Sequence, residues 1–492
     1  MSKRTPSNQD PEGLRLPIKL DSASNGEFVP VPLAPHHLRA NRLALEQATQ
    51  HARRLGLRRR EFMISACGAA STLLAMNSAF AAAGKTGGHY ALPTEAALDE
   101  AAAQSVLAGK EFIFDVQGHF VNPTGAWTRR LPEGARPLAS FEAQSCAAAS
   151  LPGNLDRLQC FGPDAFLRDI FMDSDTDLMV LSFVPSTREG EPLTIEEAAA
   201  TARIVETMQG THRLFLHGRV NPNQKHDIED MERLAREFGI SAWKTYTQWG
   251  PDGSAGFWMD DEVGLAMIEE ARRLDVRTIA IHKGLPFGPR SYEHSTCADI
   301  GRVAKRYSDV NFLIYHSGFV TDKAEGPYDP QRTDGIDALI TSVLEAGLGP
   351  GSNVYAELGS TWRFLMRDPD SAAHALGKLF KHLGAGNVLW GTDSIWYGSP
   401  QDQIQAFRSF QISEEFQQRY GYPAITPEMR AQVFGLNALK IYRVPQDVLD
   451  KHIQGDAVTA ARENYRNAPD PAFRTYGPKT RREFMNFLAW GG

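Results

Sequence analysis

The 492-residue sequence has little cysteine and no surplus of positive charge. Its four cysteines, Cys67, Cys146, Cys160 and Cys297, contain no Cys-x-x-Cys pair, which argues against a zinc ribbon and a disulfide-rich scaffold. Cys146 and Cys160 can still close one disulfide in an oxidising compartment, with two buried thiols as the alternative. Asp and Glu (59) outnumber Lys and Arg (52), so the formal charge of -7 gives no general attraction to nucleic acid.

Two further absences narrow the class of protein. No Gly-x-Gly-x-x-Gly loop follows the first predicted strand, which removes the main signal of a dinucleotide-binding fold. The apolar run from Ile64 to Met76 is rich in alanine and gives way to Asn77 and Ser78. Because a membrane span needs about 20 consecutive apolar residues, we expect no membrane association of the mature protein.

This apolar run belongs to a segment that resembles a twin-arginine export signal. Arg58-Arg59-Arg60-Glu61-Phe62-Met63 precedes it, and Ala79-Phe80-Ala81 follows it with the small-x-small pattern of a cleavage site. We therefore predict a signal at residues 58–83 and a periplasmic location. The alternatives are an ordinary amphipathic or buried helix and a cytoplasmic protein.

The flanks of this segment carry weaker signals. Residues 1–57 lack sustained periodicity, so we predict a disordered leader there. Residues 84–110 form an N-terminal segment before the folded domain, and residues 446–492 form a C-terminal extension in which residues 447–465 have helical spacing.

Residues 111–445 repeat one pattern, in which a short apolar run ends in polar residues or glycine and is followed by a stretch with helical spacing. Strands that alternate with helices pair in parallel through right-handed crossovers. Eight such units predict a (β/α)8 TIM barrel rather than an open doubly wound sheet. The predicted strands are Phe112–Phe120, Leu178–Val184, Arg213–Val220, Ser241–Gln248, Thr278–Gly284, Asn311–Gly318, Asn353–Gly359 and Asn387–Ser394.

Residues that bind metals stand at the ends of four of these strands. His119 ends the first strand, His282 the fifth, His316 the sixth and Asp393 the eighth. In a TIM barrel these ends meet at one rim, where the chemistry takes place. A single strand histidine is more often a hydrogen-bonded core residue, but four coincident strand ends favour one divalent metal, zinc or alternatively manganese.

The ordered set of strand-end residues resembles the amidohydrolase superfamily. The resemblance is strongest to the amidohydrolase-related group around aminocarboxymuconate-semialdehyde decarboxylase. It covers about Phe112 to Tyr442, and its most specific part is Trp390-Gly391-Thr392-Asp393-Ser394, followed by Gly398-Ser399-Pro400 and Phe434-Gly435-Leu436-Asn437-Ala438.

The resemblance implies a mononuclear metal site with His119, His282 and Asp393 as ligands. His316 would be the general base or would polarise the nucleophile, and Asp393 would ligate or shuttle a proton. Gln117 stands where the family usually has His, Glu or Asp, and an amide oxygen is a weaker ligand. Gln117 therefore ligates weakly, the shell rests on three residues, or the site has lost its metal.

Other residues near the strand ends are candidates for substrate binding. Lys244 would hold a substrate oxyanion or form a structural ion pair, and the tryptophans would wall a pocket for a planar substrate or pack the loops. Glu357, on the seventh strand, is predicted to support a ligand or Lys244. The substrate-binding candidates are Lys244, His217, Trp249, Trp396 and Arg290.

Three functions fit this sequence. The first is hydrolysis of a C–N or C–O bond in a small, planar or aromatic molecule, through water activated by the metal. The second is non-oxidative decarboxylation of an unsaturated or aromatic acid, and the third is a metal-free binding barrel. The predicted partner is a small-molecule substrate, and a homo-oligomer stays open.

Overall fold

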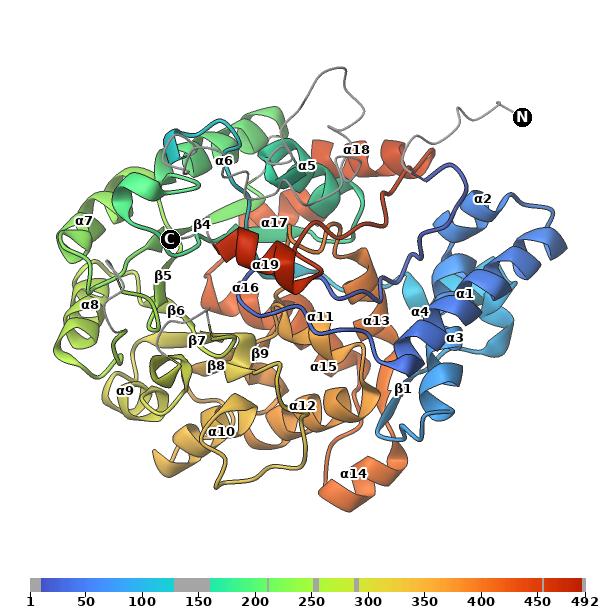
Figure 1. The fold of residues 1–492 in the computed structure, drawn as a ribbon. Coiled ribbons are helices and arrows are strands. Elements are labelled where there is room, and N and C mark those ends of the chain that lie inside the picture. The colour runs from blue at the N-terminus through green and yellow to red at the C-terminus, as the bar shows by residue number, and fades with distance from the viewer. Residues whose placement is uncertain are drawn as a thin grey trace.

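The computed structural model describes residues 10–127, 160–209, 212–250, 256–286, 292–453 and 455–488. Its centre is a sheet of eight parallel strands surrounded by helices (Figure 1). The strands are β2 (Phe114–Gly118), β3 (Leu178–Leu181), β4 (Leu214–Arg219), β5 (Ala242–Tyr246), β6 (Thr278–His282), β7 (Asn311–Tyr315), β8 (Val354–Glu357) and β9 (Val388–Leu389).

The sheet closes into a barrel, which confirms the predicted (β/α)8 fold. The strands pair in chain order from β2 to β9. The first and last strands then meet, because Val116 N donates to Trp390 O at 3.0 Å and Gly118 bridges Ser394 in parallel. All eight predicted strands are present.

Each strand is followed by helices on the outside of the barrel, as right-handed crossovers require. The stretches in which we expect helices from their spacing appear as α6 to α10 and α12, and they are residues 195–208, 228–238, 261–274, 297–307, 336–346 and 372–383. The helices of the barrel are α5 (Pro163–Leu167), α6 (Ile195–Gln209), α7 (Asp227–Phe238), α8 (Glu262–Arg273), α9 (Ile300–Arg306), α10 (Gly335–Glu345), α11 (Thr361–Leu365), α12 (Pro369–His382), α13 (Gln401–Ser409), α14 (Glu414–Tyr420), α15 (Pro427–Ala431) and α16 (Asn437–Ile441).

The inside of the barrel is filled by alternate residues of the strands. Phe114 and Val116 of β2 join a buried cluster with Leu313, Leu389 and Tyr442. Since side chains alternate along a strand, Gln117 would face away from this cluster in a regular β2. The pairing of β2 with β3 shifts register between Asp115 and Gly118, however, and such a bulge re-aims the side chains that follow it.

The N-terminal residues are folded, so the prediction of disorder over residues 1–57 is wrong for residues 10–57. Helix α1 (Pro35–Arg54) buries Ala40, Ala44, Ala48 and Ala52. This stripe of alanines, spaced by four residues, packs against α3 (Ala66–Ala81). Alanine is only weakly apolar, so the stripe does not stand out in the sequence.

The predicted signal segment forms two helices, α2 (Arg59–Ile64) and α3. Arg60 of the twin-arginine motif is 6% exposed and donates from Nη2 to Asp470 Oδ1 at 2.9 Å. The segment thus has the structure of a buried helix, while twin-arginine export stays a prediction. Within the described residues, no helix has the length and apolarity to cross a membrane.

Residues 84–110 complete the N-terminal layer beside the barrel (Figure 1). Strand β1 (Gly88–Tyr90) pairs antiparallel with β10 (Phe410–Ile412), and α4 (Glu100–Leu107) packs on α3 and α13. Cys160 is disulfide-bonded, while Cys67 and Cys297 are free. The predicted partner of Cys160, Cys146, lies outside the described residues.

The C-terminal extension is helical, as expected, with α17 (Gln446–Ile453), α18 (Ala457–Arg466) and α19 (Arg481–Leu488). Helix α18 is tied to the barrel by Arg213, whose side chain is fully buried. Its Nε and Nη2 donate to the two oxygens of Asp456, at 2.6 and 2.5 Å, and Nη1 donates to Asp177 O. This bidentate pair fixes the start of α18.

We predict that Asp456→Ala lowers the free energy of unfolding by about 3–5 kcal/mol, because it leaves the Arg213 charge buried without a partner. The measurement is chemical denaturation followed by circular dichroism. The matched control is Asp447→Ala, which removes an exposed carboxylate 3.8 Å from Lys451 and should cost less than about 1 kcal/mol. Equal effects of the two substitutions would contradict the anchoring role.

Candidate metal centre

The C-terminal ends of the strands carry unusual backbone conformations. His316, Ser360 and Asp393 have φ values of 62°, 53° and 55°, in the left-handed region that residues other than glycine rarely adopt. Each follows a barrel strand directly or within a few residues. Such conformations cost energy and gather at functional sites, where they aim side chains that a regular strand would not.

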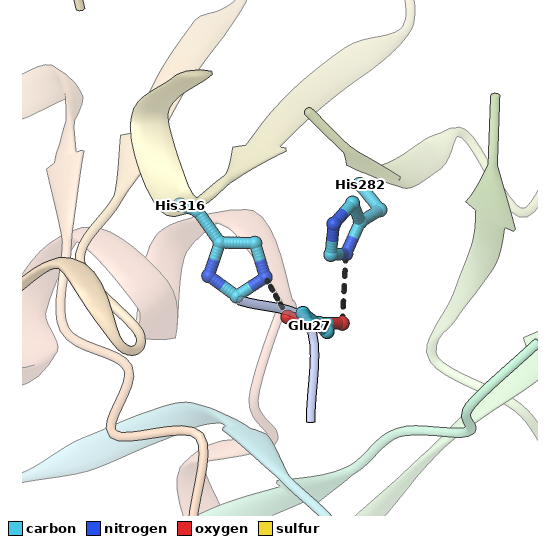
Figure 2. Close-up of side chains that lie close together, drawn as sticks. All are labelled: Glu27, His282 and His316. Atoms are coloured by element: carbon cyan, nitrogen blue, oxygen red, sulfur yellow. Dashed lines mark ion pairs between the residues drawn. The ribbon is translucent and has the colours of Figure 1, made fainter. Parts of the chain in front are cut away.

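Two of the predicted residues meet a third that was not predicted. His282 and His316 face the carboxylate of Glu27, which the N-terminal segment brings to the barrel (Figure 2). Glu27 Oε1 lies 3.3 Å from His282 Nδ1, and Glu27 Oε2 lies 3.4 Å from His316 Nε2. In the described part of the chain, this is the one group of three such side chains whose ligand atoms lie within 4.8 Å of one another.

The other predicted ligands form a second, adjacent group. His119 Nε2 lies 3.1 Å from Asp393 Oδ1, and Gln117 Nε2 donates to the same oxygen at 3.1 Å. Asn25 connects the two groups, since its Nδ2 donates to Asp393 Oδ2 at 2.6 Å and also to Glu27 Oε2. The predicted ligands therefore lie in two adjacent buried groups, His282 with Glu27 and His119 with Asp393, which Asn25 joins, and their shared binding of one metal stays a prediction.

Each of the three histidines is anchored through its far ring nitrogen to a backbone carbonyl. His119 Nδ1 lies 3.0 Å from Ser182 O, His316 Nδ1 lies 2.7 Å from Gly359 O, and His282 Nε2 lies 3.4 Å from Leu285 O. A carbonyl oxygen only accepts, so the far nitrogens carry the protons and, in the neutral rings of His282 and His316, the near nitrogens present lone pairs.

These lone pairs face carboxylate oxygens. Two acceptors at 3.3–3.4 Å repel unless a proton or a cation lies between them. His282 Nδ1, His316 Nε2 and Gln117 Oε1 are buried and make no hydrogen bond. Histidines anchored in this way to carbonyls are typical of metal ligands, so the donor set fits a divalent cation.

Burial and mutual contacts set the charges of the site. Burial alone would raise the pKa of Asp393, but the hydrogen bond and charge of His119 outweigh it and lower the pKa to about 2. Burial lowers the pKa of His316 to about 4 and that of His282 well below its usual value. Asp393 is therefore ionised and the two imidazoles are neutral near pH 7, which is the state that binds metal.

Glu357 of β8 supports His316 from behind, in agreement with its predicted supporting position. Its side chain is fully buried and accepts hydrogen bonds from His316 N at 3.0 Å and Gly359 N at 2.5 Å. Burial raises the pKa of Glu357 to about 8. A Cβ at Gly391 would lie 1.6 Å from Glu357 Oε1, so only glycine leaves room for this carboxyl.

Of the predicted substrate-binding residues, Lys244 interacts electrostatically with the carboxyl groups of Glu27, Glu357 and Asp393. Its Nζ is buried, makes no hydrogen bond, and lies 3.6 Å from the ring centre of Tyr315. Burial lowers the pKa of Lys244 to about 7 although Glu27, Glu357 and Asp393 act to raise it. The role of Lys244 in holding a substrate anion stays a prediction.

The remaining predicted residues differ in placement. Trp396 packs with its ring centre 6.5 Å from that of His119, and Trp249 is buried just after β5. His217 is engaged at both ring nitrogens, with Tyr442 Oη at 2.8 Å and Ser182 Oγ at 3.2 Å. Arg290 lies outside the described residues. The predicted roles of these four residues in substrate binding stay predictions.

Sequence reasoning missed Glu27, Asn25 and Ser360. Ser360 Oγ donates to Asp393 Oδ2 at 2.5 Å and lies just beyond β8. Asn25 and Glu27 stand in a loop-like stretch without periodicity, inside the residues predicted to be disordered. No local pattern marks them, because their place at the site depends on a long-range fold of the N-terminal segment over the barrel.

The barrel carries histidines and carboxylates at the C-terminal ends of its strands, which is the arrangement of a TIM-barrel enzyme with a candidate metal-binding site. The model of a family described as amidohydrolase matches residues 114–444, more than half of the chain. The chain therefore belongs to the amidohydrolase family, which confirms the resemblance of its motifs. It is an enzyme of hydrolase or lyase type.

Solved structures with a similar fold have low sequence identity. The 5-carboxyvanillate decarboxylase of Novosphingobium aromaticivorans, solved with manganese, is 13% identical with a TM-score of 0.44, covering 68% of this chain and 98% of its own. A 2,6-dihydroxybenzoate decarboxylase from Rhizobium is 15% identical with a TM-score of 0.36, covering 68% and 99%. No curated protein matches the chain.

We predict that Glu357→Ala lowers the free energy of unfolding by about 2–4 kcal/mol, because two buried backbone N–H groups lose their acceptor. Thermal and chemical denaturation measure this change. Glu345→Ala, at the exposed end of α10, is the control and should change stability by less than about 0.5 kcal/mol. A stability of Glu357→Ala equal to that of the control would show that Glu357 does not hold the β7 and β8 ends.

Proposed function

We propose that this protein is a metal-dependent enzyme that removes carbon dioxide from a small, planar carboxylic acid. The observation that carries metal dependence is the set of three imidazoles, each anchored to a carbonyl and each aimed at a carboxylate. His119, His282 and Asp393 would hold the ion, with zinc or manganese as the metals that suit nitrogen and oxygen ligands. When bound, it supplies a Lewis acid that polarises a substrate oxygen.

Two features of the site favour decarboxylation over other reactions of the family. The side chains of His282, His316 and Lys244 are fully buried, so bulk water is kept from the reacting atoms. Decarboxylation consumes no water. Lys244 offers an ammonium group without a hydrogen-bond partner, which suits the anionic group of an acid.

We assign substrate binding and proton transfer to different residues of the site. Lys244 binds the anionic substrate, and Trp396 packs beside His119 on the wall of the site. The bond between the substrate carbon and its carboxylate breaks, the electron pair stays on carbon, and carbon dioxide leaves. His316 takes up one proton from solvent at Nε2 and passes it to this carbon, where it replaces the carboxylate, because Gly359 O fixes its other nitrogen.

Hydrolysis of an ester, lactone or amide is the second candidate. The same Nε2 lone pair of His316, buried and without a hydrogen bond, is suited to take a proton from an attacking water. The two reactions differ in their products, so one assay separates them.

We predict that the purified protein, loaded with zinc or manganese, releases carbon dioxide from members of a panel of aromatic and unsaturated carboxylic acids. His282→Ala should lower this rate at least about 1000-fold, because it removes a ligand from the strand ends. His89→Ala, an exposed histidine of β1, is the matched control and should retain the rate. Turnover of esters, lactones or amides without carbon dioxide would replace decarboxylation by hydrolysis.

We further predict that Lys244→Met raises KM for the acid at least about 10-fold, because the ammonium that neutralises the substrate is lost. Steady-state kinetics with the best acid of the panel measure the effect. The control is Lys305→Met, at an exposed position on α9. An unchanged KM in Lys244→Met would assign Lys244 to packing against Tyr246 and Tyr315 instead.

A further inference from the structure

We infer that Glu27 is a metal ligand, and that it takes the place of the strand-one ligand whose position is occupied by Gln117. The inference rests on the proposed metal dependence. Glu27 lies outside residues 114–444, the part of the chain that the family model matches. The ligand therefore comes from a segment that the barrel itself does not supply.

The separations around Glu27 suit shared coordination better than direct pairing. A tetrahedral ion with bonds of about 2.1 Å sets its ligand atoms about 3.4 Å apart. Glu27 Oε1 and His282 Nδ1 are 3.3 Å apart, Glu27 Oε2 and His316 Nε2 are 3.4 Å apart, and neither ring nitrogen makes a hydrogen bond. A carboxylate and a ring nitrogen in a hydrogen bond would lie closer, at about 2.7–3.2 Å.

Gln117 offers from strand one only its amide oxygen Oε1, a weaker ligand than an imidazole or a carboxylate. Its amide nitrogen points at the centre of the second group, 3.1 Å from Asp393 Oδ1 and 3.5 Å from His119 Nε2. An amide N–H₂ group donates hydrogen bonds and cannot coordinate a cation. Gln117 Nε2 thus orients Asp393, and the first ligand position of the family pattern holds an amide in place of an imidazole or a carboxylate.

Charge also points to Glu27. The two imidazoles of His119 and His282 are neutral ligands, and Asp393 carries one negative charge. A divalent ion with this set alone would leave a net positive charge in a buried site, which is costly. The carboxylate of Glu27, itself only 6% exposed, brings the set to neutrality.

Hydrogen bonds and an ion pair hold Glu27 and the residues before it in place. Asn25 Oδ1 accepts from Glu27 N at 2.9 Å, and Ser24 N donates to Pro478 O at 2.8 Å. Upstream, Lys19 Nζ donates to Tyr397 O at 2.8 Å, and Arg363 pairs with Asp21 at 2.8 Å. Helix α11, the loop after β9 and the C-terminal tail therefore hold residues 19–27 over the strand ends.

This placement has a consequence for the export signal predicted at residues 58–83. Cleavage after Ala81 would remove Glu27 together with α1, α2 and α3. A chain that uses Glu27 as a ligand must keep its N-terminal segment.

Zinc binding by the full-length protein tests the inference. Metal is removed with a chelator, and the dissociation constant for Zn²⁺ is measured by competition with a chromophoric chelator, without reference to activity. Glu27→Gln should weaken zinc binding at least about 100-fold, since loss of even a supporting residue costs 10–100-fold. Glu46→Gln, with an exposed carboxylate on α1, should bind like the wild type.

A second variant guards against a folding defect. Adding Gln117→His to Glu27→Gln returns a ligand to strand one and should restore the affinity to within about 10-fold of the wild type. Circular dichroism confirms the fold of each variant.

The outcomes separate this inference from the proposed function. Zinc affinity of Glu27→Gln equal to that of the wild type overturns the inference. A gain in activity in that case would show that the Glu27 side chain blocks the substrate site. A wild type that binds zinc but releases no carbon dioxide overturns decarboxylation and leaves the ligand assignment standing. A wild type that binds no zinc or manganese overturns both.

Discussion

The structure depends on one electrostatic constraint, which is that buried imidazole lone pairs face buried carboxylate oxygens. His282 and His316 face Glu27 at 3.3 and 3.4 Å, beside the pair of His119 and Asp393 at 3.1 Å. The lone pairs of His282 and His316 at such distances from a carboxylate require a proton or a cation between them, and the carbonyl anchors of the rings prevent the rings from turning away. The strained backbone at His316 and Asp393 persists because it holds this arrangement.

The fold supports this centre from three directions. The barrel strands deliver His119, His282 and Asp393 at their C-terminal ends, and the bulge in β2 turns Gln117 and His119 toward the site. Glu357, on the neighbouring strand β8, fixes the backbone of His316 by accepting a hydrogen bond from its N–H group. Residues 19–27 close the site from above, so that its reactive groups lie in a low-dielectric environment in which each charge acts strongly.

Much of this architecture could be predicted from the sequence. The eight strands and six of the helices follow from apolar runs and periodicity, and the strand-end residues follow from the rule that parallel barrels carry their chemistry at one rim. The N-terminal segment could not be predicted, because the alanine stripe of α1 is a weak signal and residues 19–27 gain their structure only from contacts with loops and a tail far along the chain. Glu27 could not be predicted as a site residue for the same reason, because it lies in residues 19–27.

Anomalous X-ray diffraction at a metal absorption edge, from crystals of the full-length protein grown with zinc, tests the central claim most directly. We predict one strong anomalous peak at roughly 2.0–2.2 Å from His119 Nε2, His282 Nδ1, Asp393 and Glu27. Absence of a peak at the strand ends, with the histidines protonated and hydrogen-bonded directly to Asp393 and Glu27, would contradict it.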